Sequence, residues 1–182
     1  MYSKLLLPLG FLAAATLSSA ASTVYLIRHG EKPSDGGKGL SALGEERAQC
    51  LRTVFGAASD YNIGYIMAET PKKTKTKIGT GGKRARPYDT VLPLADDLGL
   101  TIDTSCDRDD ADCVKDVVDS YSGSGNILIC WEHGELTDIV EALGDSNAPT
   151  YPDDRFDIIW TDPSPYTSIV SETSENCSGL DN

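Results

Sequence analysis

The sequence has few of the residues on which metal and redox sites depend. Of its 182 residues only two are histidine and five are cysteine, and neither a CxxC pair nor an HExxH motif occurs. A structural zinc site and a metalloprotease site therefore have no support. After the first twenty residues no run is long and apolar enough to span a membrane. We expect no metal, no cofactor and no membrane partner for the mature chain.

Basic residues are also scarce. Sixteen lysines and arginines face 28 aspartates and glutamates, which gives a net charge of -12. Nucleic acids and anionic membranes would repel such a chain, so we expect no nucleic-acid partner. The hydrophobic content of 40% is typical of a globular protein. The length favours one domain, placed at residues 21–182, while the oligomeric state stays open.

Two common enzyme motifs are absent. Residues 79–83, Gly-Thr-Gly-Gly-Lys, look like a phosphate-binding loop, but the Walker spacing fails and Arg84 stands where Ser or Thr is required. Residues 121–125, Tyr-Ser-Gly-Ser-Gly, do not have the G-x-S-x-G order of a nucleophile elbow. Neither a P-loop nucleotidase nor an α/β-hydrolase is therefore indicated.

The N-terminus has the layout of a secretory signal peptide. Lys4 precedes an apolar run from Leu5 to Ala15, and small residues follow. This run is shorter than the roughly 20 residues that a spanning helix needs. We predict a signal peptide over residues 1–20, cleaved after Ala20 or Ala21, and a secreted, extracellular protein.

The five cysteines fit that compartment. Cys106 and Cys113 flank an acidic turn and are expected to close a small disulfide loop. Of the other three we prefer a Cys50–Cys177 bridge, although the sequence leaves the connectivity open. Cys130 lies at the end of an apolar strand, where we expect a buried free thiol.

Strands and helices are predicted to alternate along the chain. The predicted strands cover residues 24–27, 63–68, 101–104, 126–131 and 156–160, and the predicted helices cover 41–55, 87–98, 109–121 and 136–143. This alternation predicts an α/β sandwich with a largely parallel central sheet. Residues 166–171 are a candidate antiparallel edge strand.

The two histidines occupy matching places in this pattern. His29 and His133 each follow an apolar strand, and each begins the triplet His-Gly-Glu. In an open α/β sheet the carboxyl ends of the strands line the binding crevice. We therefore expect the two imidazoles to share one site.

Arginines beside this site would suit a phosphoryl group. Such a group carries about two negative charges, and the planar guanidinium binds oxygens in pairs. Arg28 precedes His29 directly. A second cation is expected from the basic stretch 71–86, with Arg86 favoured over Arg84 because it begins a predicted helix, where backbone N–H groups also attract anions.

Four landmarks in order resemble the histidine phosphatase superfamily, also called phosphoglycerate mutase-like. They are Arg28-His29-Gly30-Glu31, the segment 40–44, the Arg-x-x-x-Thr segment 86–90 and the strand 127–133 that presents the second histidine. The resemblance covers about residues 24–140. It implies a three-layer α/β/α sandwich and a small phosphorylated substrate as partner.

The resemblance also implies a mechanism without a metal. His29 would attack phosphorus and become phosphohistidine, while Arg28, Arg86 and His133 would hold the phosphate oxygens. The implied function is a secreted phosphomonoester hydrolase. The alternatives are a catalytically inactive secreted protein of the same fold that binds phosphate or another anion, and, less favoured, a phosphomutase.

Such a mechanism needs a carboxylic acid to protonate the leaving oxygen. By resemblance the first candidate is Asp107, which comes after a predicted strand. Glu135 and Glu132 lie beside the second histidine and are the other two candidates. The choice among the three stays open at this point.

Overall fold

The chain alternates strands and helices as predicted. The computed structural model describes residues 21–72 and 82–181, so the predicted signal peptide and the lysines of residues 73–81 lie outside the described residues. The elements are β1 (Thr23–Arg28), α1 (Ala42–Val54), β2 (Ile63–Ala68), α2 (Arg86–Leu98), β3 (Ile102–Asp103), α3 (Ala111–Ser120), β4 (Asn126–Trp131), α4 (His133–Leu143), β5 (Ile158–Pro163) and β6 (Ser171–Ser174).

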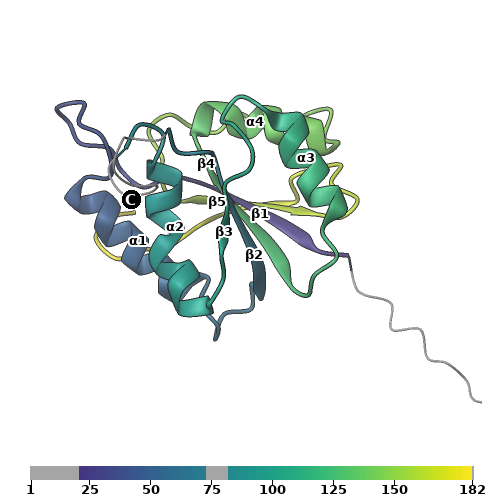
Figure 1. Ribbon diagram of the computed structural model, residues 1–182, viewed down its shortest axis with the longest axis horizontal. Coiled ribbons are helices and arrows are strands. Elements are labelled where there is room, and N and C mark those ends of the chain that lie inside the picture. The colour runs from purple at the N-terminus through teal and green to yellow at the C-terminus, as the bar shows by residue number, and fades with distance from the viewer. Residues whose placement is uncertain (1–20, 73–81, 182) are drawn as a thin grey trace, which may run out of the picture.

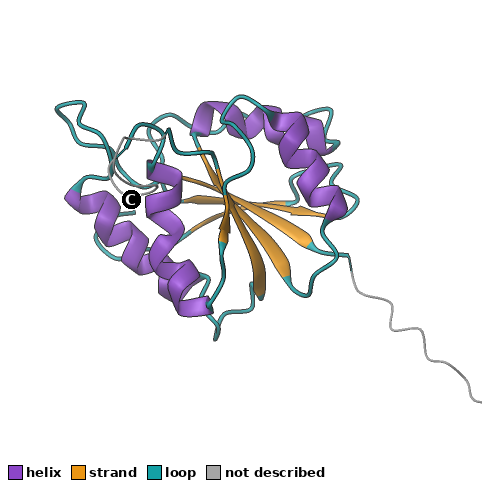
Figure 2. Ribbon diagram, in the orientation of Figure 1, coloured by secondary structure: helices purple, strands orange, loops and turns teal. Residues whose placement is uncertain are grey.

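The strands form one twisted sheet in the order β3-β2-β4-β1-β5-β6 (Figure 2). The pairs formed among β1 to β4 are parallel, whereas β5 pairs antiparallel with β1 and β6 pairs antiparallel with β5. The mostly parallel sheet of the predicted fold class is thus confirmed. The edge strand lies at Ser171–Ser174 instead of 166–171, because a turn in which Tyr166 N donates to Pro163 O delays the return of the chain.

Helices cover both faces of the sheet. Helices α1 and α2 pack side by side on one face, and α3 and α4 lie together on the other (Figure 1). The core under α1 and α2 includes Leu51, Phe55, Val91, Leu94, Ile66 and Leu128, and the core under α3 and α4 includes Val114, Val118, Leu136, Ile139, Leu26 and Ile129. The three-layer sandwich follows from these two cores on opposite sides of one sheet.

Helices α1, α3 and α4 each have a side-chain N-cap, and those of α1 and α4 follow the strands that precede the histidines. Ser41 caps α1 by accepting from Gly44 N at 3.1 Å, as its position predicted. Helix α4 begins at His133, three residues earlier than predicted, because Glu132 accepts from Gly134 N at 2.9 Å and serves as its N-cap. The second histidine therefore lies in the first turn of a helix.

Two disulfides are formed, and both match the predicted pairs. Cys50 in α1 bonds Cys177 in the C-terminal segment, and Cys106 bonds Cys113 across the loop before α3. Cys130 is a buried free thiol, as expected. Within residues 21–72 and 82–181, no helix has the length and apolarity needed to cross a bilayer.

Candidate active site

His29 stands at the carboxyl end of β1 and is only 4% exposed. Its backbone N–H donates to Trp131 O at 3.1 Å, which joins it to the end of the neighbouring strand β4. Its ring Nδ1–H donates to the carbonyl oxygen of Gly30 at 2.7 Å. This bond fixes the tautomer, so that Nε2 carries the lone pair that a nucleophile needs.

The surroundings of His29 keep its imidazole neutral. Burial lowers its pKa to about 4, the positive charges of Arg28, Arg86 and His133 act in the same direction, and the hydrogen bond to Gly30 opposes them. The three predicted partners of His29 are therefore near enough to lower its pKa. A neutral imidazole with cations nearby can attack an anionic group that those cations attract.

Arg28 is buried, and the loop that follows α4 holds it from two sides. Its Nη1 donates to the carbonyl oxygens of Asp153 and Arg155, both at 2.7 Å, and its guanidinium stacks 3.8 Å from the centre of the Phe156 ring. Its buried Nε has no hydrogen-bond partner among the described residues. An unpaired donor on a buried cation suits an anionic ligand.

Arg86 begins α2 and is held by the loop that follows His29. Its Nε donates to Gly39 O at 2.8 Å and its Nη2 to Gly37 O at 2.9 Å. One turn later, the Thr90 hydroxyl donates to Arg86 O at 2.7 Å and accepts from Gly30 N at 2.9 Å. The Arg-x-x-x-Thr spacing thereby ties α2 to the backbone next to the first histidine.

Two glycines let α1 approach this backbone. A Cβ on Gly30 would lie 2.9 Å from Gly44 O, and a Cβ on Gly44 would lie 2.5 Å from Glu31 O. Neither position has room for a side chain. The glycines of the two sequence landmarks are thus required because the chain segments touch each other.

His133 faces carboxylates with both ring nitrogens. Its Nε2 lies 3.0 Å from Asp153 Oδ1, and its Nδ1 lies 2.8 Å from Glu132 Oε1, within ion-pair distance but without hydrogen-bond geometry. Both nitrogens can donate when the ring is protonated, and the Asp153 carboxylate that faces Nε2 is exposed.

The structure separates the two candidate arginines of the basic segment. The charge of Arg86 lowers the pKa of His29. Arg84 instead lies against the loop before α3, where it donates to Asp109 Oδ2 at 3.2 Å and lies 3.9 Å from Asp107 Oδ1. The side chain of Asp107 is 73% exposed. Glu135 lies 3.5 Å from Arg108 and is less exposed.

A buried charge network behind the site was not predicted. Arg47 is 1% exposed and lies 2.7 Å from Glu31, 2.5 Å from Glu175 and 2.9 Å from Asp181. It thus joins the glutamate of the first His-Gly-Glu triplet to the C-terminal segment, which Cys177 also bonds to α1. Only tertiary structure brings these groups together, and no local sequence signal points to the network.

Glu69 is a second residue that was missed. It follows β2 directly and is 2% exposed, and its Oε2 has no hydrogen-bond partner among the described residues. Burial raises its pKa to about 7. Glu69 comes directly after a buried strand, as His29 does. A search for carboxylates at strand ends would therefore have identified Glu69 from the sequence.

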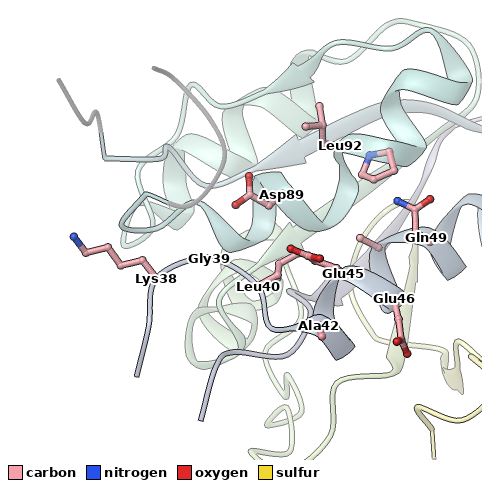
Figure 3. A pocket seen from close by; sticks show the side chains of 11 residues that line it. Lys38, Gly39, Leu40, Ala42, Glu45, Glu46, Gln49, Asp89 and Leu92 are labelled. Carbon is pink, nitrogen blue, oxygen red and sulfur yellow. The ribbon is translucent and has the colours of Figure 1, made fainter. Parts of the chain in front are cut away.

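The linings of the two larger cavities include neither histidine. A cavity of about 720 Å³ lies between α1 and α2, next to the loop at Lys38, with Glu45 and Asp89 on its walls (Figure 3). Another, of about 670 Å³, is lined by Phe156, Leu43 and residues 31–34. Within the described part of the chain, no cluster of three or more His, Cys, Asp or Glu residues could hold a metal ion.

Solved structures share this arrangement of elements. No family model matches the sequence, and no curated protein is significantly similar to it. A protein histidine phosphatase, SixA, solved with tungstate, has a TM-score of 0.57 at 15% identity, covering 84% of this chain and 97% of its own. An α-ribazole-5'-phosphate phosphatase described as putative, from Escherichia coli K-12, also has a TM-score of 0.57 at 15% identity, with 85% and 98% covered. The chain has the histidine phosphatase fold.

A third solved structure of this histidine phosphatase fold was obtained with inorganic phosphate. It is a mycobacterial glucosyl-3-phosphoglycerate phosphatase with a TM-score of 0.51 at 15% identity, covering 85% of this chain and 95% of its own. The histidine phosphatase fold thus spans most of the chain.

Proposed function

We propose that the protein is a phosphomonoester hydrolase that acts through a phosphohistidine on His29. The observation that carries this proposal is a buried, neutral imidazole with a fixed tautomer, surrounded by the charges of Arg28, Arg86 and His133. Such a site attracts a phosphate dianion and presents a nitrogen nucleophile to it. The fold shared with phosphatases supports the same reaction class.

The proposed reaction has two steps. In the first, His29 Nε2 forms a bond to phosphorus while the bond from phosphorus to the ester oxygen breaks, and a carboxylic acid protonates the departing oxygen. In the second, water attacks the phosphohistidine and gives its proton to that carboxylate, and inorganic phosphate leaves. Arg28, Arg86 and His133 stabilise the charge on the phosphoryl oxygens in both steps.

Hydrolysis of p-nitrophenyl phosphate with a chelator present tests the proposal. His29→Ala should lower kcat by at least about 1000-fold, because it removes the nucleophile. Trapping of labelled phosphate on the wild-type chain, and not on the variant, identifies the intermediate. Unchanged thermal melting of the variant shows that the loss is chemical and not a folding defect.

Two results would contradict the hydrolase assignment. Turnover that survives in His29→Ala would exclude the histidine mechanism. Binding of inorganic phosphate by the wild-type chain, without turnover of any phosphomonoester between pH 4 and 8, would favour the alternative of an anion-binding protein. A phosphomutase would instead pass the labelled phosphate to a second substrate.

We also propose that the chain is secreted. The two disulfides support this, since such bonds persist in oxidising compartments. Expression from the full sequence in a secreting eukaryotic host should yield protein in the medium with an N-terminus at Ala21 or Ser22. Retention of Met1 in the recovered protein would count against the signal peptide.

A further inference from the structure

Glu69 lies at the same level along the sheet as the ends of β1 and β4, which are the two strands that precede the histidines. Ala68 on β2 and Ile27 on β1 are both in register with Cys130 on β4. The residues that follow these three in the sequence are Glu69 just after β2, Arg28 on β1 and Trp131 on β4. Glu69 therefore lies at the same carboxyl edge as His29, about 10 Å away across one intervening strand.

The Glu69 side chain is buried where an ionised carboxylate is costly. It is 2% exposed, and Oε2 has no hydrogen-bond partner among the described residues. Burial raises its pKa to about 7, and nearby charges act in both directions. Arg84 and Arg108 lower the pKa, and Glu132 and Asp109 raise it. The acid form is therefore populated up to neutral pH.

We propose that Glu69 is the general acid that protonates the leaving oxygen and, as a carboxylate, takes the proton of the attacking water. This assignment rests on the proposed phosphohistidine reaction. The proton moves from Glu69 Oε2 to the ester oxygen as the bond from that oxygen to phosphorus breaks, and water later returns a proton to the carboxylate, so the cycle leaves Glu69 unchanged.

The carboxylates indicated by the sequence are engaged or exposed in the structure. Asp107 is 73% exposed, Glu132 caps α4 through Gly134 N, and Glu135 lies 3.5 Å from Arg108. A proton donor works best when its pKa lies near the working pH and water is excluded. Glu69 is 2% exposed, and its pKa of about 7 lies within the pH range of the proposed assay.

The test uses Glu69→Gln and two substrates that differ in their leaving groups. The departing p-nitrophenolate is stable without a proton, whereas the alkoxide of an alkyl phosphate needs one. We expect kcat/KM to fall by about 100-fold or more for the alkyl phosphate and by less than about tenfold for p-nitrophenyl phosphate. Glu172→Gln is a matched control on the exposed surface of β6 and should change neither value.

Asp107→Asn and Glu135→Gln are the competing variants. If either one shows the dependence on the leaving group while Glu69→Gln lowers both substrates equally, the assignment to Glu69 is overturned. Labelled phosphate should still be trapped on His29 in Glu69→Gln with p-nitrophenyl phosphate. Absence of turnover and trapping in the wild-type enzyme would instead refute the proposed function, so the two failures can be told apart.

A measurement on the wild-type enzyme keeps the proposal testable if Glu69→Gln does not fold. The kcat/KM for an alkyl phosphate should fall as the pH rises through about 7, because Glu69 loses its proton there. The same limb should be weak or absent for p-nitrophenyl phosphate. Equal basic limbs for both substrates would contradict a proton donor at Glu69.

Discussion

The low pKa of His29 predicts an enzyme that stays active in acid. An ordinary histidine has a pKa near 6.5, and at pH 5 only about 3% of it is neutral. With a pKa of about 4, about 90% of His29 is neutral at pH 5. In the proposed hydrolase, protonation of His29 should therefore lower kcat/KM at pH 5 by about a tenth, whereas an unperturbed histidine would lower it about 30-fold.

The assay is the pH dependence of kcat/KM for p-nitrophenyl phosphate between pH 3.5 and 8, corrected for ionisation of the substrate phosphate near pH 6. The acid limb should centre near pH 4. In Arg86→Met it should move to higher pH by less than about one unit, because a positive charge is lost while burial remains the main cause. A tenfold fall per unit that begins near pH 6.5 in the wild-type enzyme would refute the reasoning.

The remaining predictions concern stability. Loss of the Cys50–Cys177 bridge through alanine substitutions should cost about 5 kcal/mol in urea unfolding, and loss of Cys106–Cys113 about 2 kcal/mol, because their sequence separations are 127 and 7 residues. Equal losses would contradict the chain-entropy argument. Asp162 is fully buried without a hydrogen-bond partner among the described residues, and burial raises its pKa to about 7. Its pKa in the folded state exceeds the unfolded value near 4, because the folded state disfavours the ionised carboxylate. The free energy of unfolding therefore falls as the pH rises from about 4 to 7. Asp162→Asn should raise Tm at pH 8 by at least about 2 °C and change it little at pH 4, and a Tm gain that is the same at both pH values would be the opposing result.

The sequence predicted the central elements well, because their signals are local. The strands at residues 63–68 and 126–131 agree with the structure residue by residue, since each is a short buried apolar run. The antiparallel return after β5 depends on a turn at Pro163 and on the sheet edge, and neither leaves a periodic pattern. The edge strand was therefore placed too early.

The sequence also indicated which charged groups lie near His29. Arg28, Arg86 and His133 follow strand ends or begin a helix, so their positions can be derived from element boundaries, and all three act on His29. The burial of Glu69 could not be derived in this way. The charged residues that shift its pKa, which are Arg84, Arg108, Asp109 and Glu132, come from segments far apart in the sequence.

The hold on Arg28 has a consequence for ligand affinity. Its guanidinium is fixed by two backbone carbonyls and an aromatic ring before any ligand arrives. The rotamer entropy of this long side chain is therefore lost when the protein folds, and the proposed phosphate ligand would not have to order it again. A lysine at this position would keep the charge but lose the stacking on Phe156 and the paired N–H donors of the guanidinium. Each binding event would then include the entropic cost of ordering the side chain.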